Sequence, residues 1–271
     1  MKTINKSAFT ISKLNTDSID EERFNNALSE VIAMQKGMKG IGTLSEKSVH
    51  AVLKHYYASN HQYHEVKIGN FVADACVDGE IYEIQSKSFY LMKNKLNSFL
   101  KNYDVTIIHP ISLKKYIRYI DQETGEIKER RLSNKTMILY DALLELYSIK
   151  DYLNNKHLHF IFCFMETEEY KLLDGYGKDK KIKATKTDKV PTKLVGEFYI
   201  NKKRDFLDFL PGYKNGRRQK DCPLPKEFTS NDIATYAGCN ADYARYLLNI
   251  LSYLGLIKNI GNKGRNKLYT I

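Results

Sequence analysis

Hydrophobic and polar positions follow two different periods along this chain of 271 residues, and each period predicts one kind of element. Apolar residues that recur every three to four positions indicate amphipathic helices. The predicted helices cover about 18–35, 45–58, 90–102, 135–153 and 206–210. Short alternating or continuous apolar runs indicate strands. The predicted strands lie within 66–87, 105–108, 159–165 and 194–200, and the polar residues 1–17 are expected to be loose.

Residues 70–87 are predicted to form a hairpin that turns at Asp78-Gly79, because this dipeptide favours the tight turns that join antiparallel strands. The first strand carries one acid, Asp74. Alternation places four residues of the second strand on one face. They are Ile81, Glu83, Gln85 and Lys87. An acid, an amide and an ammonium ion in a row do not form a core, so this face is the candidate site.

Two further segments concentrate positive charge. Residues 114–132 are predicted to form a second hairpin that turns at Thr124-Gly125 and bears Arg130 and Arg131. Residues 174–193 are rich in Lys and Gly, and a mobile basic loop is expected there. The net charge of the whole chain is +11, which favours an acidic partner, with nucleic acid as the first candidate.

The four cysteines lie far apart in the sequence and form no CxxC pair, which argues against a zinc ribbon and against a disulfide scaffold. The first fifteen residues are polar and do not resemble a signal peptide. No apolar run is long enough to span a bilayer. A cytoplasmic protein of a bacterium or phage, without contact to a membrane, is expected.

Residues 43–111 resemble the core of the PD-(D/E)xK nuclease superfamily. Their predicted order is a helix, a strand with an acid, a strand with a row of polar residues, a helix and a strand. Glu46 matches the helix acid of that family, Asp74 the first-strand Asp, and Gln85-Ser86-Lys87 the (E/Q)xK element. The variant with Gln before Lys is similar to Mrr-type restriction nucleases. No Pro precedes Asp74, which departs from the family pattern.

The resemblance implies Mg²⁺ or Mn²⁺ as cofactor, because oxygen ligands suit these ions and phosphodiester hydrolysis needs a hard cation. The residues implied as metal ligands are Asp74, Glu83, Gln85 and Glu46. Lys87 would stabilise developing negative charge or orient water. Two registers stay open, because Glu83-Ile84-Gln85 also fits the element with Gln in place of its Lys.

Residues 226–271 resemble a winged helix-turn-helix module, with a short helix, a turn at Gly238, a longer helix from Asn240, and a terminal hairpin. In that family the second helix enters the major groove and the wing contacts phosphates or the minor groove. The implied DNA-contacting residues are Asn240, Asp242, Tyr243, Arg245 and Tyr246 on the helix and Lys263 and Arg265 on the wing. Arg130 and Arg131 would add phosphate contacts.

The expected fold is α/β, with a restriction-endonuclease-like central mixed sheet flanked by helices and a C-terminal winged-helix domain. The expected divisions are an N-terminal helical arm (1–42), a nuclease-like domain (43–210), a linker (211–225) and the winged helix (226–271). The expected function is metal-dependent hydrolysis of double-stranded DNA, in restriction, transposition or repair, with a homodimer as a compatible state. The alternatives are a non-catalytic DNA-binding regulator on a degenerate nuclease fold and an RNA-directed or toxin-like nuclease.

Overall fold

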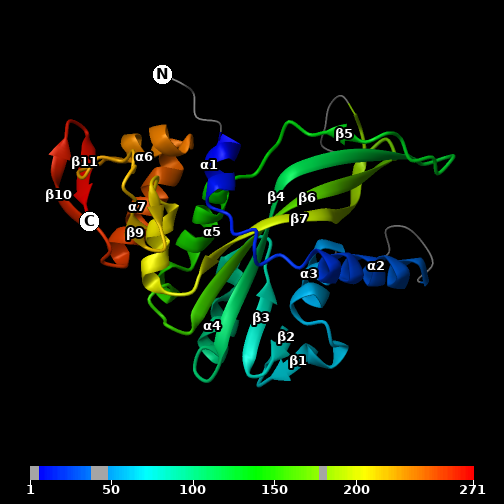
Figure 1. Ribbon diagram of the computed structural model, residues 1–271. Helices are drawn as coiled ribbons and strands as arrows, with labels where there is room; N and C mark the ends of the chain where they lie inside the picture. The colour runs from blue at the N-terminus through cyan, green and yellow to red at the C-terminus, as the bar shows by residue number, and fades with distance from the viewer. Residues whose placement is uncertain (1–5, 38–47, 177–181) are drawn as a thin grey trace.

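A computed structural model describes residues 6–37, 48–176 and 182–271, and its central element is one mixed sheet (Figure 1). Within these residues the strand order is β1-β2-β3-β4-β6-β7, with β5 paired to β4. The strands are β1 (His64–Ile68), β2 (Phe71–Val77), β3 (Glu80–Ile84), β4 (Asp104–Asp121), β5 (Arg131–Leu132), β6 (Leu158–Leu173) and β7 (Thr185–Ile200). The pairs β3–β4 and β4–β6 are parallel and the other pairs are antiparallel. The expectation of an α/β fold with a mixed central sheet is confirmed.

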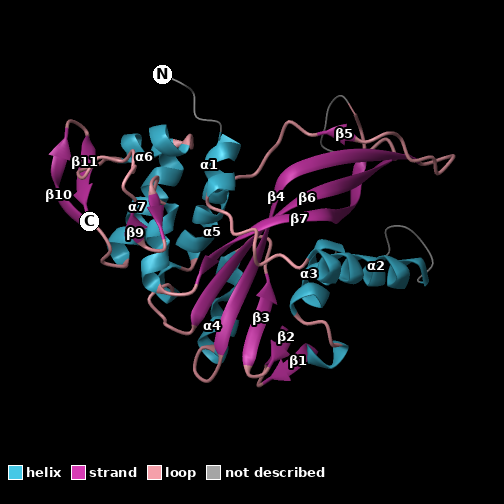
Figure 2. Ribbon diagram, viewed as in Figure 1, coloured by secondary structure: helices cyan, strands magenta, loops and turns pink. Residues whose placement is uncertain are grey.

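Helices flank the sheet on both sides (Figure 2). The α-helices are α1 (Lys6–Ser12), α2 (Glu21–Gly37), α3 (Ser48–Tyr57), α4 (Lys93–Phe99), α5 (Leu143–Ser148), α6 (Ser230–Ala237) and α7 (Ala241–Tyr253). The 3₁₀ helices are η1 (His61–Tyr63), η2 (Phe89–Met92), η3 (Leu139–Ala142), η4 (Lys150–Tyr152) and η5 (Lys203–Phe209). The single helix expected over 135–153 is therefore three short pieces. None of the helices in the described ranges is long and apolar enough to cross a bilayer.

The two faces of the sheet bury two hydrophobic layers. Neighbouring residues of β4 show the division: Ile107 packs into the layer that contains α4 and α5, and Ile108 into the layer that contains α2 and α3. Both side chains are fully buried. Each such side chain contributes roughly 1.5–3 kcal/mol of hydrophobic stabilisation. Strands buried on both faces explain the nearly continuous apolar run of the central sequence.

The hairpin between β2 and β3 is confirmed. Asp78 and Gly79 both have positive φ, as the predicted turn requires, and Ala75 pairs with Tyr82. An additional strand, β1, pairs with β2 through a turn at Gly69 and was not predicted as a separate element. The local order is consequently helix, three antiparallel strands, helix, and a parallel strand.

Three strands run well beyond the core and form an arm, which consists of residues 114–121, 166–173 and 185–193 of β4, β6 and β7 (Figure 1). The prediction that the central strand stops at His109-Pro110 is wrong, because β4 continues to Asp121. It forms the first strand of the expected second hairpin and pairs with β5 at Ile117–Arg131. The loop expected over 174–193 is also wrong from Thr185 onward, where β7 begins.

The C-terminal segment consists of α6, a turn at Gly238, α7, and a hairpin of β10 (Lys258–Lys263) and β11 (Asn266–Thr270). The side chain of Asn240 caps α7 by accepting a hydrogen bond from the backbone N–H of Asp242. Leu247 and Leu251 of α7 are fully buried in the same hydrophobic layer as the sheet. The segment expected as a separate domain therefore shares the core of the sheet.

Two segments that were expected to lie outside the folded domains also pack against this core. Residues 211–225, expected as a linker, form β8 (Tyr213–Lys214) and β9 (Arg217–Arg218), and Leu224 is fully buried. Residues 6–17, expected to be loose, include α1, whose Phe9 is buried in the core.

Candidate functional site

Asp74 of β2 and Glu83 of β3 each lie one residue beyond Ala75 and Tyr82, the last pair of the β2–β3 ladder. Both side chains line one cavity of about 1030 Å³. Two neighbouring carboxylates repel each other unless a cation or proton compensates them. The site therefore contains a concentration of negative charge that the sheet itself does not balance.

Lys95 of α4 supplies one compensating charge. Its Nζ lies 3.0 Å from Oε1 and 2.9 Å from Oε2 of Glu83. The Glu83 side chain is only 6% exposed. Burial, followed by the charge of Asp74, raises the pKa of Glu83 to about 7, although the Lys95 ammonium acts in the opposite direction. Glu83 is thus a carboxyl group whose proton exchanges near neutral pH.

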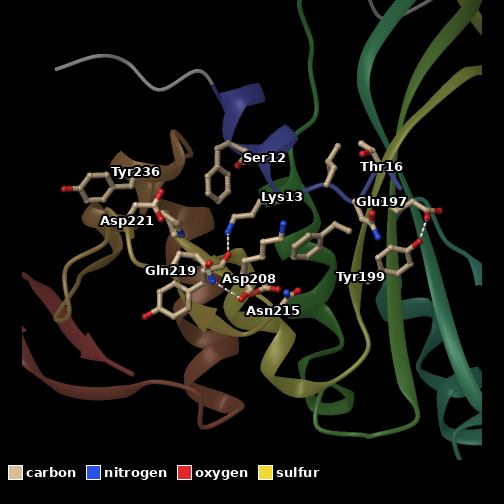
Figure 3. A pocket seen from close by; sticks show the side chains of 18 of the residues that line it. Ser12, Lys13, Thr16, Glu197, Tyr199, Asp208, Asn215, Gln219, Asp221 and Tyr236 are labelled. Atoms are coloured by element: carbon tan, nitrogen blue, oxygen red, sulfur yellow. Dashed lines mark hydrogen bonds between the residues drawn. The ribbon is translucent and has the colours of Figure 1, made fainter. Parts of the chain in front are cut away.

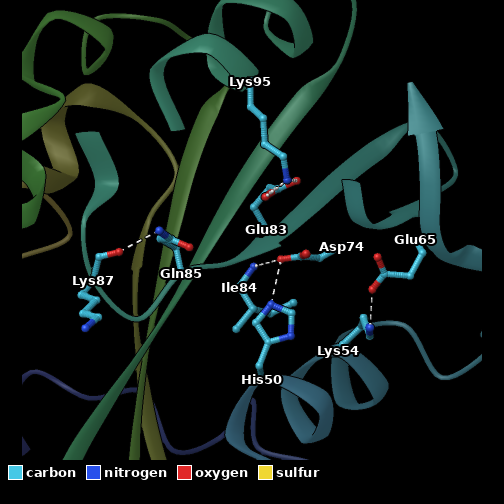
Figure 4. A network of polar contacts seen from close by, with 9 residues as sticks. All are labelled: His50, Lys54, Glu65, Asp74, Glu83, Ile84, Gln85, Lys87 and Lys95. Carbon is cyan, nitrogen blue, oxygen red and sulfur yellow. Dashed lines mark hydrogen bonds and ion pairs between the residues drawn. The ribbon is translucent and has the colours of Figure 1, made fainter. Parts of the chain in front are cut away.

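Asp74 is held by two hydrogen-bond donors. Its Oδ2 accepts a hydrogen bond from the backbone N–H of Ile84 at 2.8 Å and lies 3.1 Å from Nε2 of His50 on α3 (Figure 4). Burial opposes ionisation of Asp74, but the contact with His50 and the Ile84 N–H outweigh it and lower the pKa of Asp74. Asp74 is therefore ionised while Glu83 titrates, which gives the two acids different properties.

The other predicted residues of the polar row lie elsewhere. Gln85 follows the end of β3, and its Nε2 donates to the backbone carbonyl of Lys87 at 2.7 Å. The Lys87 side chain is exposed and points away from Asp74 (Figure 4). The prediction that Lys87 shares a strand face with Glu83 is therefore wrong, because β3 ends at Ile84. The chain leaves the strand after Ile84, so alternation no longer fixes the direction of Lys87. Glu46 lies outside the described residues.

Basic residues border the cavity on the side of β7. Lys186 and Lys189 line it together with Lys87 and Lys95. Asp188 lies between them in the sequence and accepts hydrogen bonds from the backbone N–H and the hydroxyl of Ser48 at the start of α3. The first turn of α3 and the base of the arm are thereby connected across the cavity.

The predicted DNA-contacting residues divide into buried and exposed groups. Tyr243 donates to Oδ1 of Asp141 at 2.9 Å, and Tyr246 packs against Tyr147 of α5 with ring centroids 5.1 Å apart. These two tyrosine side chains of α7 therefore contact the rest of the protein. Asn240 acts as the helix cap. Asp242 and Arg245 are exposed and form an ion pair with each other.

Four arginine and lysine side chains remain on the surface. Lys263 and Arg265 are exposed on the C-terminal hairpin. Arg130 is exposed but stacks over Tyr116 at 4.5 Å, and its Nη1 lies 3.5 Å from Glu168. Arg131 of β5 is exposed and donates to the hydroxyl of Tyr119. The positive charge of Arg130 is thus partly balanced within the arm.

A second cavity, of about 830 Å³, lies between α1, β7 and residues 208–223 (Figure 3). Nζ of Lys13 donates to the carbonyls of Leu210 at 2.9 Å and Tyr213 at 2.5 Å. Burial lowers the pKa of Lys13 to about 8. These polar groups hold the N-terminal segment to the core, so we regard this cavity as structural.

His50 and Lys95 complete the candidate site and were not predicted. His50 lies in the helix that precedes the hairpin, and Lys95 in the helix that follows it. Their positions relative to Asp74 and Glu83 depend on how the helices cross the sheet. No local sequence signal distinguishes Lys95 from the neighbouring Lys93, since only the orientation of α4 decides which of them faces the acids.

Residues 47–201, more than half of the chain, match a family described as "Domain of unknown function (DUF8091)". This range includes Asp74, Glu83 and Lys95 and ends with β7. An uncharacterized protein of Treponema pallidum (strain Nichols) is 25% identical over 231 residues, which cover 84% of this chain and 86% of that protein. No solved structure gives a significant match. The chain belongs to the DUF8091 family.

Proposed function

We propose that this protein is a Mg²⁺-dependent endodeoxyribonuclease whose active site contains Asp74, Glu83 and Lys95. The observation that carries the proposal is the pair of carboxylates in one cavity, with a lysine 2.9–3.0 Å from one of them and further lysines at the cavity border. The order of helix, antiparallel strands, helix and parallel strand supports a restriction-endonuclease-like core. This assignment favours the register Glu83-Ile84-Gln85, with Lys95 in place of the strand lysine.

The donor set fits a hard divalent cation. Asp74 and Glu83 offer carboxylate oxygens, and burial, followed by the charge of Asp74, raises the pKa of Glu83 to about 7. These two residues would hold the ion. When bound, it would offset the charge of a phosphodiester and lower the pKa of an attacking water.

The residues of the chain then have separate roles. His50 fixes the orientation of the Asp74 carboxylate through its 3.1 Å contact. Lys95 neutralises Glu83 and is the group that would face a phosphate oxygen as negative charge develops there. Lys186 and Lys189 would bind the phosphate backbone at the cavity edge. We assign Lys87 no role in the chemistry.

The C-terminal module is proposed to be a winged helix that contacts DNA through its hairpin. Lys263 and Arg265 are exposed there, whereas Tyr243 and Tyr246 pack against the rest of the protein. Binding should therefore depend on the hairpin more than on the first turns of α7. The expected contacts are with phosphates, so affinity should fall steeply with salt.

The test is cleavage of supercoiled plasmid with Mg²⁺ or Mn²⁺, and Lys95→Met is compared with Lys87→Met. Asp74→Asn and Lys95→Met should each lower the nicking rate by at least about 100-fold, the loss typical of a removed transition-state contact. Lys87→Met should stay within about threefold, since one exposed phosphate contact contributes little. Equal nicking by all preparations would refute the proposal. Single-stranded DNA and RNA are parallel substrates that test the RNA-directed alternative.

Two observations favour a second candidate, a non-catalytic DNA-binding protein. Lys87 points away from the acids, and both oxygens of Glu83 already contact Lys95 (Figure 4). In that case wild-type protein would shift duplex DNA in a gel with strong salt dependence but leave it intact with either metal. Lys263→Ala with Arg265→Ala would weaken the shift, and Asp74→Asn would not.

A further inference from the structure

Three histidines that do not line the 1030 Å³ cavity lie close to one another. They are His55 on α3, His61 on η1 and His64 at the start of β1, and they offer ligand atoms that all lie within 4.8 Å of one another. The ring centroid of His55 lies 4.6 Å from that of His61 and 4.7 Å from that of His64. Three imidazoles from three elements therefore converge on one point.

A carboxylate from a fourth element faces the same point. Glu30 of α2 places Oε1 2.6 Å from Nε2 of His61 and Oε2 3.2 Å from Nδ1 of His55. One carboxylate thus bridges two of the three rings. A hydrogen bond fixes the orientation of the His64 ring, since its Nε2 lies 2.6 Å from the carbonyl oxygen of Ala58. Such a contact to a backbone carbonyl is the usual support of a metal-binding imidazole.

His55 gives an independent indication that something is bound here. Its side chain is only 6% exposed, and among the residues that the structure describes its Nδ1 has no hydrogen-bond partner. The nearby Glu30 oxygen satisfies the distance for an ion pair but not the alignment of a hydrogen bond. A buried nitrogen without a partner is costly and therefore rare in folded proteins.

We propose that His55, His61, His64 and Glu30 bind one Zn²⁺ ion. Three imidazole nitrogens and one carboxylate oxygen form the four-coordinate, borderline-soft set that Zn²⁺ prefers, whereas Mg²⁺ and Ca²⁺ take oxygen ligands. Four protein ligands leave no open position, so the ion has a structural role. It fastens α2, α3, η1 and β1 to one another.

The chain offers a matched control at another place. His157 lies 2.7 Å from Asp104, and His159 lies 3.8 Å from the same oxygen. This second cluster has two histidines and one acid, and His157 and Asp104 are about as exposed as His61 and Glu30. Among the described residues it lacks a third imidazole and a buried nitrogen without a hydrogen bond. It should not hold Zn²⁺ with comparable affinity.

The test is titration of chelator-treated protein with Zn²⁺, and with Co²⁺ as a spectroscopic substitute. Wild type should bind one Zn²⁺ per chain, rise in Tm, and give the intense visible bands of tetrahedral Co²⁺. His61→Ala and Glu30→Gln should each weaken binding by at least about tenfold, the loss that even an outer-shell partner causes. Both side chains are about half exposed, so the variants should fold. His157→Ala should bind as wild type does.

The proposal fails if Co²⁺ shows no tetrahedral spectrum, if His61→Ala binds as tightly as wild type, or if His157→Ala loses as much affinity. An excess of Mg²⁺ should not displace the ion, which separates this site from the proposed nuclease site. Loss of DNA cleavage in Asp74→Asn with unchanged Zn²⁺ binding would show that the two sites are independent.

Discussion

At the residue scale, the candidate site depends on two acids in one cavity that differ in their ionisation. Asp74 has a lowered pKa because donors from His50 and Ile84 favour its charged form despite burial. Glu83 has a pKa raised to about 7, because burial and the charge of Asp74 disfavour its ionised form. Neighbouring acids with separated pKa values are typical of functional sites, which is why this pair is a stronger candidate than other buried acids.

Glu83 should impose a measurable pH dependence on stability. Its pKa of about 7 in the folded protein exceeds its ordinary value of 4.5, so the folded state binds more protons between these values. The free energy of unfolding should therefore fall as the pH rises from 5 to 8. In Glu83→Gln this contribution is absent, and the fall should be smaller by roughly 2–3 kcal/mol. Urea unfolding of both proteins at several pH values measures the difference.

Because both proteins retain every other titrating group, the difference between their curves isolates Glu83. Lys95→Met is the companion variant: it removes a charge that favours ionised Glu83, so its stability should fall more than that of wild type over the same interval. Parallel curves for wild type and Glu83→Gln would show that Glu83 titrates outside this range.

Part of this site could be predicted from the residues alone. Asp78-Gly79 fixes the turn, and the turn fixes the register, so Asp74 and Glu83 were predictable as neighbours. Lys87 was not, because alternation predicts direction only within a strand and β3 ends at Ile84. His50 and Lys95 depend on helix packing across the sheet, which short-range patterns do not encode.

At the element scale, the arm is held together by ion pairs between its strands. Glu169 of β6 lies within 4 Å of Lys115 on β4, Lys171 on β6 and Lys186 on β7. Its side chain is only 10% exposed. Cross-strand charge pairs stabilise sheets in the way that i, i+4 pairs stabilise helices. Glu169 therefore compensates three ammonium ions at once.

Replacing Glu169 with Gln should loosen the arm without unfolding the core. Three lysines would lose their common partner, and amides of β6 and β7 in the arm should exchange about fivefold faster, which corresponds to about 1 kcal/mol. Amides of β3 and of β4 before Pro110 should keep wild-type rates. Hydrogen exchange followed by mass spectrometry resolves the two regions.

Glu166→Gln is the matched control, because the Glu166 carboxylate forms a single ion pair within the described part of the chain, with Lys114, and that lysine is 56% exposed. Glu166→Gln should raise the amide exchange rates of the arm less than Glu169→Gln does. Added salt should reduce the difference in exchange rate between the two variants. Equal exchange rates in both variants would mean that the three-lysine network contributes nothing beyond a single surface pair.

Two prolines explain why the sequence did not predict the length of the arm, because proline normally indicates the end of a strand. Pro110 would normally end a central strand, but β3 has already ended opposite Ile108, so no neighbour on that side needs its missing N–H. Pro191 lies in β7 at the sheet edge, next to a register shift between Glu166 and Thr167. Sequence patterns place proline outside central strands, and here only the extent of the neighbouring strands shows why it is tolerated.

At the scale of the whole molecule, the C-terminal segment and the sheet form one hydrophobic layer. Leu247 and Leu251 are buried with Phe209 and Leu146, and Nζ of Lys150 lies 3.1 Å from Oδ1 of Asn249. Independent domains meet through smaller and more polar surfaces. We therefore expect the chain to unfold as one unit, even though residues 226–271 follow a helix and hairpin pattern of their own.

A chain that ends after residue 225 should lose cooperative unfolding, because it exposes the apolar surface that α6 and α7 cover. Calorimetry of the full chain should show one transition. A chain that ends after Ile257 is the control: it keeps both helices, lacks the hairpin of exposed β10, and should retain one transition at a modestly lower temperature. Two separate transitions in the full chain, with the shorter chain reproducing one of them, would contradict this expectation.

The continuity of β4, β6 and β7 from the core into the arm restricts how this family can vary in size. A single inserted residue in one of these strands would turn every later side chain to the opposite face, and would separate Glu169 from its lysines. Changes in length are tolerated when residues are added in pairs to adjoining strands, so the arm grows in steps of roughly 7 Å. The distance from the cavity to the end of the arm is therefore set in discrete increments, and related proteins should differ in it by whole steps.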